Sequence, residues 1–181
     1  MKKNNLEYID AIKELAQRYS IELKETELTP KEAEKEAKKD ILRNIYKQAG
    51  VYYSKQLEGT AKEYALSRFK EDTLGIFKIG YASTQWHGLF DYLTKECGYK
   101  PEQLEKSELF RKNKNGEYYD FFRDRLMFPI FDHLGNIIAF SGRDLSLKDD
   151  VPKYINSSET DLYKKKEVLY GMNFARVARL T

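Results

Sequence analysis

Three arginines stand at the ends of two strongly apolar runs, where a purely structural strand would carry Thr, Lys or Glu. Arg123 and Arg125 precede the run LMFPIF, and Arg143 follows the run IIAFSG. A guanidinium keeps its positive charge and presents a planar set of N–H donors that suits phosphate oxygens. Side chains of this type at these positions indicate a site for a phosphate-bearing anion.

The two apolar runs flank a short turn, and their alternation predicts an antiparallel β-hairpin. If the loop has three residues with Gly135 in the left-handed conformation, Asp132 faces Asn136 and Arg125 faces Arg143. A loop that is one residue shorter or longer shifts the pairing by one residue. In every case we expect both arginines at the end of the hairpin away from the turn.

Arg123 lies two residues before Arg125, so within a strand the two side chains share one face. We therefore expect the three guanidiniums to converge. Like charges that face each other destabilise a sheet, and a bound polyanion would relieve this repulsion. The alternative is an ordinary surface network in which nearby carboxylates pair with the arginines: Asp120, Asp124 and Asp144.

The loop after the hairpin carries further groups that could contact a nucleotide. Pro152 stiffens the approach to Lys153, whose ammonium suits a phosphate. The amide of Asn156, two residues after Tyr154, could contact a base or a sugar. The alternative is an exposed loop without a ligand. A basic run further on, which could equally be a solvated face, consists of Lys164, Lys165 and Lys166.

Apolar spacing and helix-start signals predict the elements that position these groups. A short amphipathic helix is expected over residues 4–19 and a long helix over 29–57, which opens with a capping box from Thr29 to Glu32. The other predicted elements are a helix from a second capping box at Thr60–Glu63 to about Phe69, a short helix at 72–77, a strand at 78–83, a helix from Ser83 or Thr84 to Cys97, a short helix from Pro101, a turn at 112–116 and a helix over 168–177.

The order of these elements predicts the fold class. Helices come first, and mixed structure follows without regular strand–helix–strand alternation. We therefore expect an α+β fold, with an N-terminal helical arm followed by a mixed α/β subdomain that contains an antiparallel hairpin.

The composition limits the classes of function. The 181 residues fit one domain, with or without a helical appendage, and a formal net charge of only +3 means that any basic surface is local. Cys97 is the only cysteine, which excludes an internal disulfide and a cysteine-based zinc site. No apolar run is long enough to span a membrane and no signal-peptide core follows Met1, so we expect a cytoplasmic protein.

Several catalytic sequence patterns are missing. The sequence has no P-loop and no GxGxxG, GxSxG or HExxH motif. Nucleotidyl transfer normally needs carboxylates that hold divalent metals, whereas the acidic residues here are scattered or stand in helical charge runs. The sequence therefore predicts a chain that binds phosphates and holds no metal by itself.

Three stretches, in the same order and spacing, resemble the bacterial DnaG-type DNA primases: YYDFFRDRLMFPIFDHLGNIIAFSGRDL, PKYINSSET and LYKKKEVLYG. They are similar to the N-terminal subdomain of the RNA polymerase core of that family. LEYIDAIKELAQRYSIEL is similar to the segment after the family's zinc-ribbon module. The resemblance implies that residues 1–28 are a linker helix after a zinc ribbon that this sequence lacks. It also implies that residues 29–181 are the N-terminal subdomain of the catalytic core, with a long helix at 29–57.

The resemblance implies roles for individual residues. Arg123, Arg125 and Arg143 match the arginines of the family's FRxRxMFPI and GGR motifs. Lys153 and Asn156 match its KYLNS motif, which is implicated in holding the triphosphate and base of the incoming nucleotide. The sequence departs from the family at three places: GGR reads SGR, NSPET reads NSSET, and the RGL usual after the early helix appears as Ser67-Arg68-Phe69.

Lys165 matches the lysine that precedes LYG in the family, with Lys164 and Lys166 beside it. The implied catalytic residues are Arg123, Arg125, Arg143, Lys153 and Lys165. The implied nucleotide- and DNA-binding residues are Arg123, Arg125, Arg143, Lys153, Tyr154, Asn156, Lys164, Lys165 and Lys166. No metal ligand is implied in this chain.

The function implied by the resemblance is that of a DNA primase, a DNA-directed RNA polymerase that makes short RNA primers on single-stranded DNA. Mg or Mn would arrive with the NTP and be held by a TOPRIM domain outside this sequence, and zinc would belong to a separate N-terminal module. The expected partners are single-stranded DNA, NTPs, the RNA primer and, through other domains, the replicative helicase, with no membrane. By itself this chain is expected to be inactive. The rival function is a non-catalytic module that binds single-stranded DNA or docks to the replisome.

Overall fold

The structure is a computed structural model and describes residues 16, 19, 29–146 and 148–174. The helix expected over residues 4–19 thus lies outside the described residues, apart from two positions. The chain divides into two compact units, residues 1–35 and 36–181. The described helices are α2 (Pro30–Lys55), α3 (Gly59–Leu66), α4 (Glu71–Ile76), α5 (Gly88–Asp91), the π-helix η1 (Tyr92–Glu96) and α6 (Pro101–Glu105).

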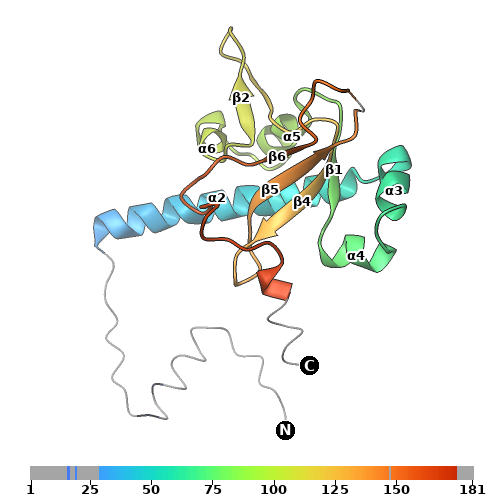
Figure 1. The fold of residues 1–181 in the computed structure, drawn as a ribbon. Helices are drawn as coiled ribbons and strands as arrows, with labels where there is room; N and C mark the ends of the chain where they lie inside the picture. Colours follow the sequence, from blue (N-terminus) through green and yellow to red (C-terminus); the bar gives the residue numbers. More distant parts are fainter. Residues whose placement is uncertain (1–15, 17–18, 20–28, 147, 175–181) are drawn as a thin grey trace. The chain divides into compact units, whose positions relative to one another are not determined.

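The strands of the described chain form two antiparallel sheets (Figure 1). The larger sheet has the order β1-β4-β5-β6, and the smaller one pairs β2 with β3. Their bounds are β1 (Gly80–Ala82), β2 (Phe110–Lys112), β3 (Tyr118–Asp120), β4 (Arg125–Phe131), β5 (Ile137–Asp144) and β6 (Tyr154–Asn156). Helices and antiparallel strands in this arrangement confirm the predicted α+β class.

Helix α2 starts where its capping box predicts. The Thr29 hydroxyl accepts a hydrogen bond from the Glu32 backbone N at 3.3 Å, and the Glu32 carboxylate accepts one from the Thr29 backbone N at 2.9 Å. The Thr29 hydroxyl also donates to the Glu32 carboxylate at 2.8 Å, and this bond, together with the one from the Thr29 backbone N, lowers the pKa of Glu32. The first turns of α2 are mostly exposed, whereas one side is buried from Leu42 onward. The residues of α2 that pack in the hydrophobic core therefore lie in the second half of the helix.

Helix α2 crosses one face of the larger sheet (Figure 1). The rings of Tyr46 and Tyr53 contact Phe140 of β5, with centroids 6.2 and 5.2 Å apart. Strand β1 approaches the helix backbone itself, because a Cβ on Gly80 would lie 2.5 Å from the carbonyl carbon of Tyr53. Only glycine fits this approach without a shift of the helix or the strand.

The hairpin of β4 and β5 has the expected turn but not the expected pairing at its far end. The Asp132 N–H donates to the Asn136 carbonyl at 2.9 Å, as a three-residue loop requires. A β-bulge between Ile130 and Phe131 then shifts the register by one residue. Arg125 consequently faces Asp144, so the prediction that Arg125 faces Arg143 is wrong.

Strand β4 has two neighbours over only part of its length. Strand β1 pairs with residues 125–127, and the rest of β4 pairs with β5 alone. Pro129, which has no N–H to donate, lies in this second part and is fully buried. The proline therefore occupies a stretch where one side of the strand has no ladder partner.

Two predicted helix starts are wrong. Helix α3 begins at Gly59 after Glu58, with no side-chain cap, so the capping box predicted at Thr60–Glu63 does not form. Helix α5 begins at Gly88 rather than near Ser83, because its first N–H groups are satisfied from another segment. That segment is β3, whose Asp120 carboxylate accepts hydrogen bonds from the backbone N atoms at positions 89 and 90.

The helix predicted over residues 168–177 is also wrong in its first part. Residues 170 and 171 form a turn, residues 172–174 are helical, and residues 175–177 lie outside the described chain. Gly171 has a φ of +78°, a left-handed conformation that interrupts a helix. The run before it, Lys165–Glu167, is a turn.

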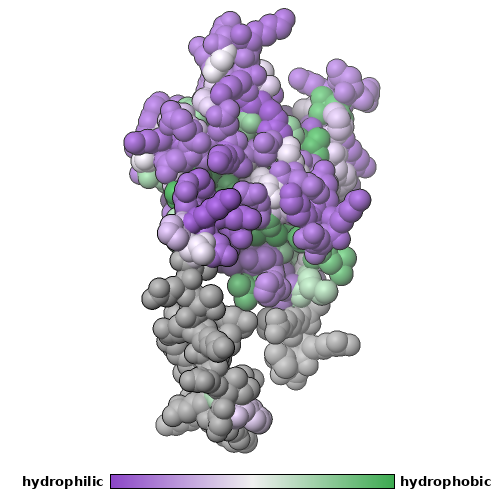
Figure 2. All heavy atoms as spheres, turned by 90° about the vertical axis from the view of Figure 1, so that its left-hand side faces the viewer, coloured by the Kyte–Doolittle hydropathy of each residue, from purple (hydrophilic) through white to green (hydrophobic). Residues whose placement is uncertain are grey.

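One face of the molecule is strongly polar. The face in Figure 2 is largely hydrophilic, with hydrophobic side chains gathered only in small areas. Charges of both signs are interspersed on α2, where Arg43 forms ion pairs with Glu36 and Asp40. Local charge, rather than net charge, must therefore decide where an anion binds.

Replacing Gly80 with Ala tests the contact between β1 and α2. We expect a loss of about 1–3 kcal/mol in the free energy of unfolding, because the new Cβ meets backbone that cannot move aside. Gly75→Ala in α4 is the matched control, since its Cβ would meet no atom within 4 Å and alanine favours a helix. Urea denaturation of both variants measures the difference. Equal stabilities of the two variants would contradict the close approach.

Candidate nucleotide and nucleic-acid interface

Arg125 is buried and ties three segments together. The residue is only 5% exposed. Its Nη1 donates hydrogen bonds to the carbonyls of Gly142 at 3.2 Å and Pro152 at 3.0 Å, and its Nη2 lies 3.7 Å from the Asp144 carboxylate. Burial lowers the pKa of the guanidinium, and the nearby Asp144 opposes that effect. The side chain thus connects β4, β5 and the loop that leads to β6.

Gly142 makes room for this arrangement. A Cβ at this position would lie 2.8 Å from Phe122 Cδ1 and 3.0 Å from Arg125 Cδ. The second glycine of the family's GGR motif is therefore required by side-chain packing against β5. Ser141 replaces the first glycine and has an ordinary strand conformation opposite Asn156.

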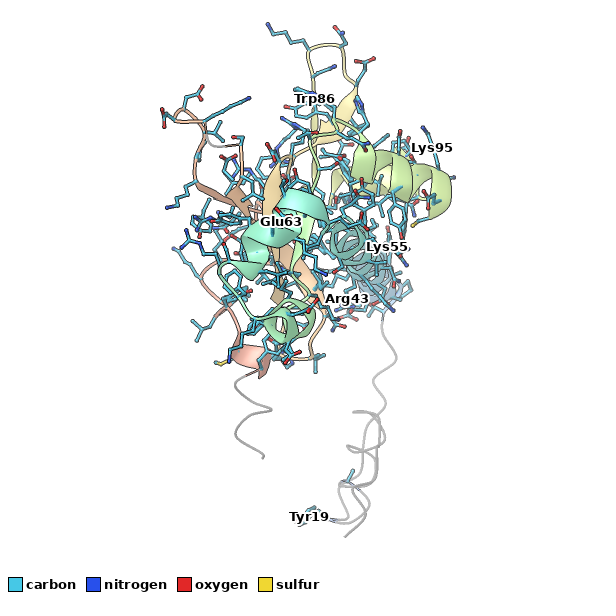
Figure 3. The ribbon with its side chains drawn as sticks, turned by 90° about the vertical axis from the view of Figure 1, so that its right-hand side faces the viewer. Tyr19, Arg43, Lys55, Glu63, Trp86 and Lys95 are labelled. Atoms are coloured by element: carbon cyan, nitrogen blue, oxygen red, sulfur yellow. The ribbon has the colours of Figure 1, made fainter. Side chains whose placement is uncertain are left out.

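Arg123 lies on a different side of the hairpin end, against aromatic rings. Its guanidinium carbon is 4.1 Å from the Trp86 ring centroid and 5.1 Å from that of Tyr119, and its Nη1 donates to the Asp120 carbonyl. Trp86 is 58% exposed and lies beside the start of α5 (Figure 3). Arg123 and Arg125 both line a cavity of about 350 Å³ that also contacts Trp86.

Arg143 lines a second cavity, of about 620 Å³, together with Lys153. Its Nη1 donates to the Tyr154 hydroxyl at 2.8 Å, and its guanidinium carbon lies 5.3 Å from the Tyr64 ring centroid. Arg68 approaches the same Tyr64 ring at 5.8 Å and lines the same cavity. With Lys148, four cationic side chains therefore line this cavity, and two of them, Arg68 and Arg143, lie over the Tyr64 ring.

The three arginines do not converge in one cluster, which corrects the prediction. Arg143 faces Leu126 across the hairpin, so it points to the opposite side of the sheet from Arg125. Asp124 has a φ of +52° and breaks the strand alternation between Arg123 and Arg125. The bulge and this left-handed residue divide the arginines between two neighbouring cavities. The residues that line both cavities are Asp124, Asp144, Lys148 and Val151.

The alternative prediction, in which nearby carboxylates neutralise the arginines, holds only for Arg125. Asp144 forms an ion pair with Arg125 and accepts from the Ser146 hydroxyl at 2.9 Å. Asp124 instead accepts from the Tyr81 hydroxyl at 2.8 Å. Within the described part of the chain, neither Arg143 nor Arg123 has a carboxylate within 4.0 Å. Two of the three guanidiniums thus keep their charge available.

Strand β6 carries the predicted nucleotide-contacting residues along an edge of the sheet. Tyr154 pairs with Arg143 and Asn156 pairs with Ser141. The Lys153 carbonyl accepts from the Asp144 N–H at 2.8 Å, which places the lysine at the mouth of the second cavity. The structure therefore brings Lys153 and Tyr154 to Arg143, with Asn156 exposed two residues further along.

The three consecutive lysines lie apart from both cavities. Lys164, Lys165 and Lys166 are exposed and line neither of them. The Lys165 N–H donates to the Glu159 carboxylate at 3.0 Å, and the Lys164 ammonium lies 3.9 Å from the same carboxylate. Glu159 thus fixes the backbone of this turn and partly neutralises it.

Several aromatic or cationic residues of the two cavities had no role in the prediction from sequence, among them Tyr64, Arg68, Trp86 and Lys148. The predicted helix from Ser83 or Thr84 to Cys97 includes Trp86, but α5 starts after it. Its position as the only tryptophan, next to a loop of small polar residues, is the one signal in the sequence that could have identified it.

Residues 49–176 match the family described as DNA primase catalytic core, N-terminal domain. The chain belongs to this family. Two DNA primases illustrate the relationship: that of Clostridium acetobutylicum is 35% identical over 97% of this chain, and that of Deinococcus radiodurans is 38% identical over 95% of it. The chain spans 29% of the length of each of these primases.

Solved structures of primase catalytic domains share the fold. The Escherichia coli primase catalytic core has a TM-score of 0.68 and 32% identity, over 77% of this chain and 45% of that chain. A DnaG primase catalytic domain bound to single-stranded DNA has a TM-score of 0.68 and 33% identity, over 78% and 46%. The RNA polymerase domain of Mycobacterium tuberculosis primase, in complex with double-stranded DNA carrying a 6-nucleotide overhang, has a TM-score of 0.70 and 30% identity, over 76% and 44%.

Two absences apply to the described residues. They contain no group of three or more His, Cys, Asp or Glu side chains that could hold a metal ion. Among their helices, none has the length and apolar character needed to cross a membrane.

Replacing Arg125 with Met tests whether this side chain organises the site. We expect a loss of about 3–5 kcal/mol in the free energy of unfolding, because Asp144 would remain buried without its cation. Lys148→Met is the control: it removes one charge from an exposed side chain of the same cavities and should change stability by about 0.5 kcal/mol or less. A similarly small effect for Arg125→Met, measured by urea denaturation, would show that the network is dispensable.

Asp120 predicts a specific dependence of stability on pH. Burial raises the pKa of its carboxyl from 3.8 to about 6, although two backbone N–H groups oppose the shift. The folded chain therefore binds more protons than the unfolded chain between these two values, and the free energy of unfolding falls as the pH rises through them, by up to about 3 kcal/mol.

The measurement is urea denaturation of the wild type and Asp120→Asn from pH 3.5 to 7.5. The difference between the two chains removes the contributions of the other carboxyl groups. It should change across this range and level off above pH 7. A constant difference would exclude a raised pKa at Asp120.

Proposed function

We propose that this chain is the part of a DNA primase that holds the phosphates of the single-stranded template and of the incoming NTP. Membership of the primase catalytic-core family supports this function, and so do the charges of the two cavities. The chain would act in the cytoplasm as one segment of a DNA-directed RNA polymerase that makes short RNA primers for replication.

The observation that carries the proposal is the cavity lined by Arg143, Lys153 and Arg68. Within the described residues, none of these three cations has a carboxylate at ion-pair distance. Aromatic rings and the Tyr154 hydroxyl hold Arg143 in place, so the guanidinium is oriented before any ligand arrives. An oriented guanidinium beside further cations, none of them in an ion pair among the described residues, favours a phosphate ligand.

In primer synthesis a 3′-hydroxyl attacks the α-phosphate of an NTP, a new phosphodiester bond forms and pyrophosphate leaves. Arg143 and Lys153 would donate hydrogen bonds to phosphate oxygens and stabilise the negative charge that develops on them. Asn156, on the exposed edge strand, would contact the base or sugar. Mg or Mn, bound with the NTP by a TOPRIM domain outside this sequence, would assist the attacking and leaving oxygens.

The cavity beside Trp86 supports binding of a single-stranded template. An exposed indole next to Arg123 offers a face on which a base can stack and a cation for the adjoining phosphate. Arg125 lines this cavity as well, but it is only 5% exposed and its guanidinium is already hydrogen-bonded within the protein. It is a positioning residue that keeps β4, β5 and the approach to β6 together.

Binding of a labelled single-stranded oligonucleotide by this chain tests the site. Replacing both Arg143 and Lys153 with Ala should weaken binding at every DNA sequence and reduce the slope of log affinity against log salt by about 1–2, because two phosphate contacts are lost. Lys114→Ala, which removes an exposed charge at the β2–β3 turn, is the control and should leave the slope unchanged. An unchanged slope in the double variant would contradict the site assignment.

Primer synthesis separates the proposed function from a purely DNA-binding role. In a protein that joins this chain to a TOPRIM domain, the same double variant should bind NTP poorly and lose most primer synthesis on single-stranded DNA. A joined protein that binds DNA but makes no primers with any NTP would favour the non-catalytic module. Normal synthesis by the double variant would show that Arg143 and Lys153 do not serve the reaction.

A further inference from the structure

Asp120, at the end of β3, contacts the segment around Trp86 through both its backbone and its side chain. Its N–H donates to the Trp86 carbonyl at 2.8 Å. Its two carboxylate oxygens accept from the backbone N atoms of Leu89 at 2.8 Å and Phe90 at 3.1 Å. One residue therefore determines where the Trp86 loop ends and where α5 begins.

The same residue also holds the partner of the tryptophan. The Asp120 carbonyl accepts a hydrogen bond from Arg123 Nη1. The guanidinium of Arg123 lies over the indole of Trp86, at 4.1 Å from the ring centroid. Asp120 is thus hydrogen-bonded both to the backbone of Trp86 and to the side chain of Arg123, whose indole and guanidinium contact each other.

We propose that Asp120 is a positioning residue, which holds the Trp86 indole and the Arg123 guanidinium in one stack at the edge of the cavity that both line. This inference rests on the proposed function, in which the stacked indole and guanidinium bind the single-stranded template. Asp120 itself is 4% exposed and lines neither of the two cavities. It acts on a ligand only through its neighbours.

The ionised carboxylate suits this task better than its protonated form. An ionised group accepts hydrogen bonds on both oxygens, whereas a protonated group keeps only one full acceptor. Burial raises the pKa of Asp120 to about 6, so the change falls near neutral pH. Acidification should therefore weaken one bond to the start of α5 and loosen the Trp86 segment.

Other charged or titratable groups also face Asp120 from the surrounding elements. Their influence on the Trp86 segment must be distinguished from that of Asp120 protonation. His87 precedes α5 and Arg123 follows β3, and both lower the pKa of Asp120. Tyr52 and Tyr53 face it from α2, and burial raises the pKa of both hydroxyls. His87 is the only histidine among these neighbours, so it is the residue to replace in a control.

The single tryptophan of the chain gives a direct readout of the stack. Excitation at the red edge of the indole band, which avoids the tyrosines, reports the emission of Trp86 and its quenching by acrylamide. We expect both to change with a midpoint near pH 6 in the wild type. The change should disappear in Asp120→Asn and persist in His87→Gln.

Binding of a single-stranded oligonucleotide at pH 7.5 provides the second readout. Asp120→Asn should weaken binding about fivefold, the effect of one ordinary hydrogen bond. Asp91→Asn is the matched control, since this exposed carboxylate on α5 pairs only with Lys95 among the described residues and should leave affinity unchanged.

Each outcome decides between the two proposals or overturns one. An Asp120→Asn chain with wild-type emission, quenching and pH profile overturns the positioning role, as does a pH profile that disappears in His87→Gln. If Asp120→Asn does not fold, the titration of His87→Gln still tests the proposal, because it leaves Asp120 in place. A wild type that shows the expected pH profile but binds no single-stranded DNA supports the positioning role and contradicts the proposed function.

Discussion

The end of the hairpin depends on one buried guanidinium. Arg125 connects the carbonyls of Gly142 and Pro152 with the carboxylate of Asp144, in a position that solvent barely reaches. A buried charge is costly unless its hydrogen bonds are made, so these partners must stay in place together. The segments that Arg125 connects in turn position Arg143 on one side of the sheet and Arg123 on the other.

Much of the fold follows from local rules, whereas the main error in the prediction comes from a feature that depends on the whole sheet. The Thr29–Glu32 box and the loop around Gly135 were predictable because a few neighbouring residues determine them. The bulge between Ile130 and Phe131 was not, because it depends on how both strands pack across the whole sheet. Its one-residue shift was enough to replace the expected pairing of two arginines with an ion pair.

The sequence predicted which residues lie at the candidate site better than it predicted how they are arranged. Arg143, Lys153 and Tyr154 do come together, since β5 and β6 pair directly. The separation of Arg123 from Arg143 depends on the left-handed backbone of Asp124, which no pattern in the sequence announces. The roles of Trp86 and Asp120 were missed for a related reason. Both depend on contacts between α5 and β3, which are about thirty residues apart in the chain.

The proline in β4 has a consequence for the behaviour of the molecule in a crowded cell. Beyond the three residues paired with β1, β4 presents one side of its backbone without a strand partner. Such an edge can recruit a strand from another chain and start aggregation. Pro129 lies in this stretch, cannot donate to an incoming strand, and is buried by neighbouring side chains. Pro129 thus makes this open stretch of β4 a poorer template for an added strand.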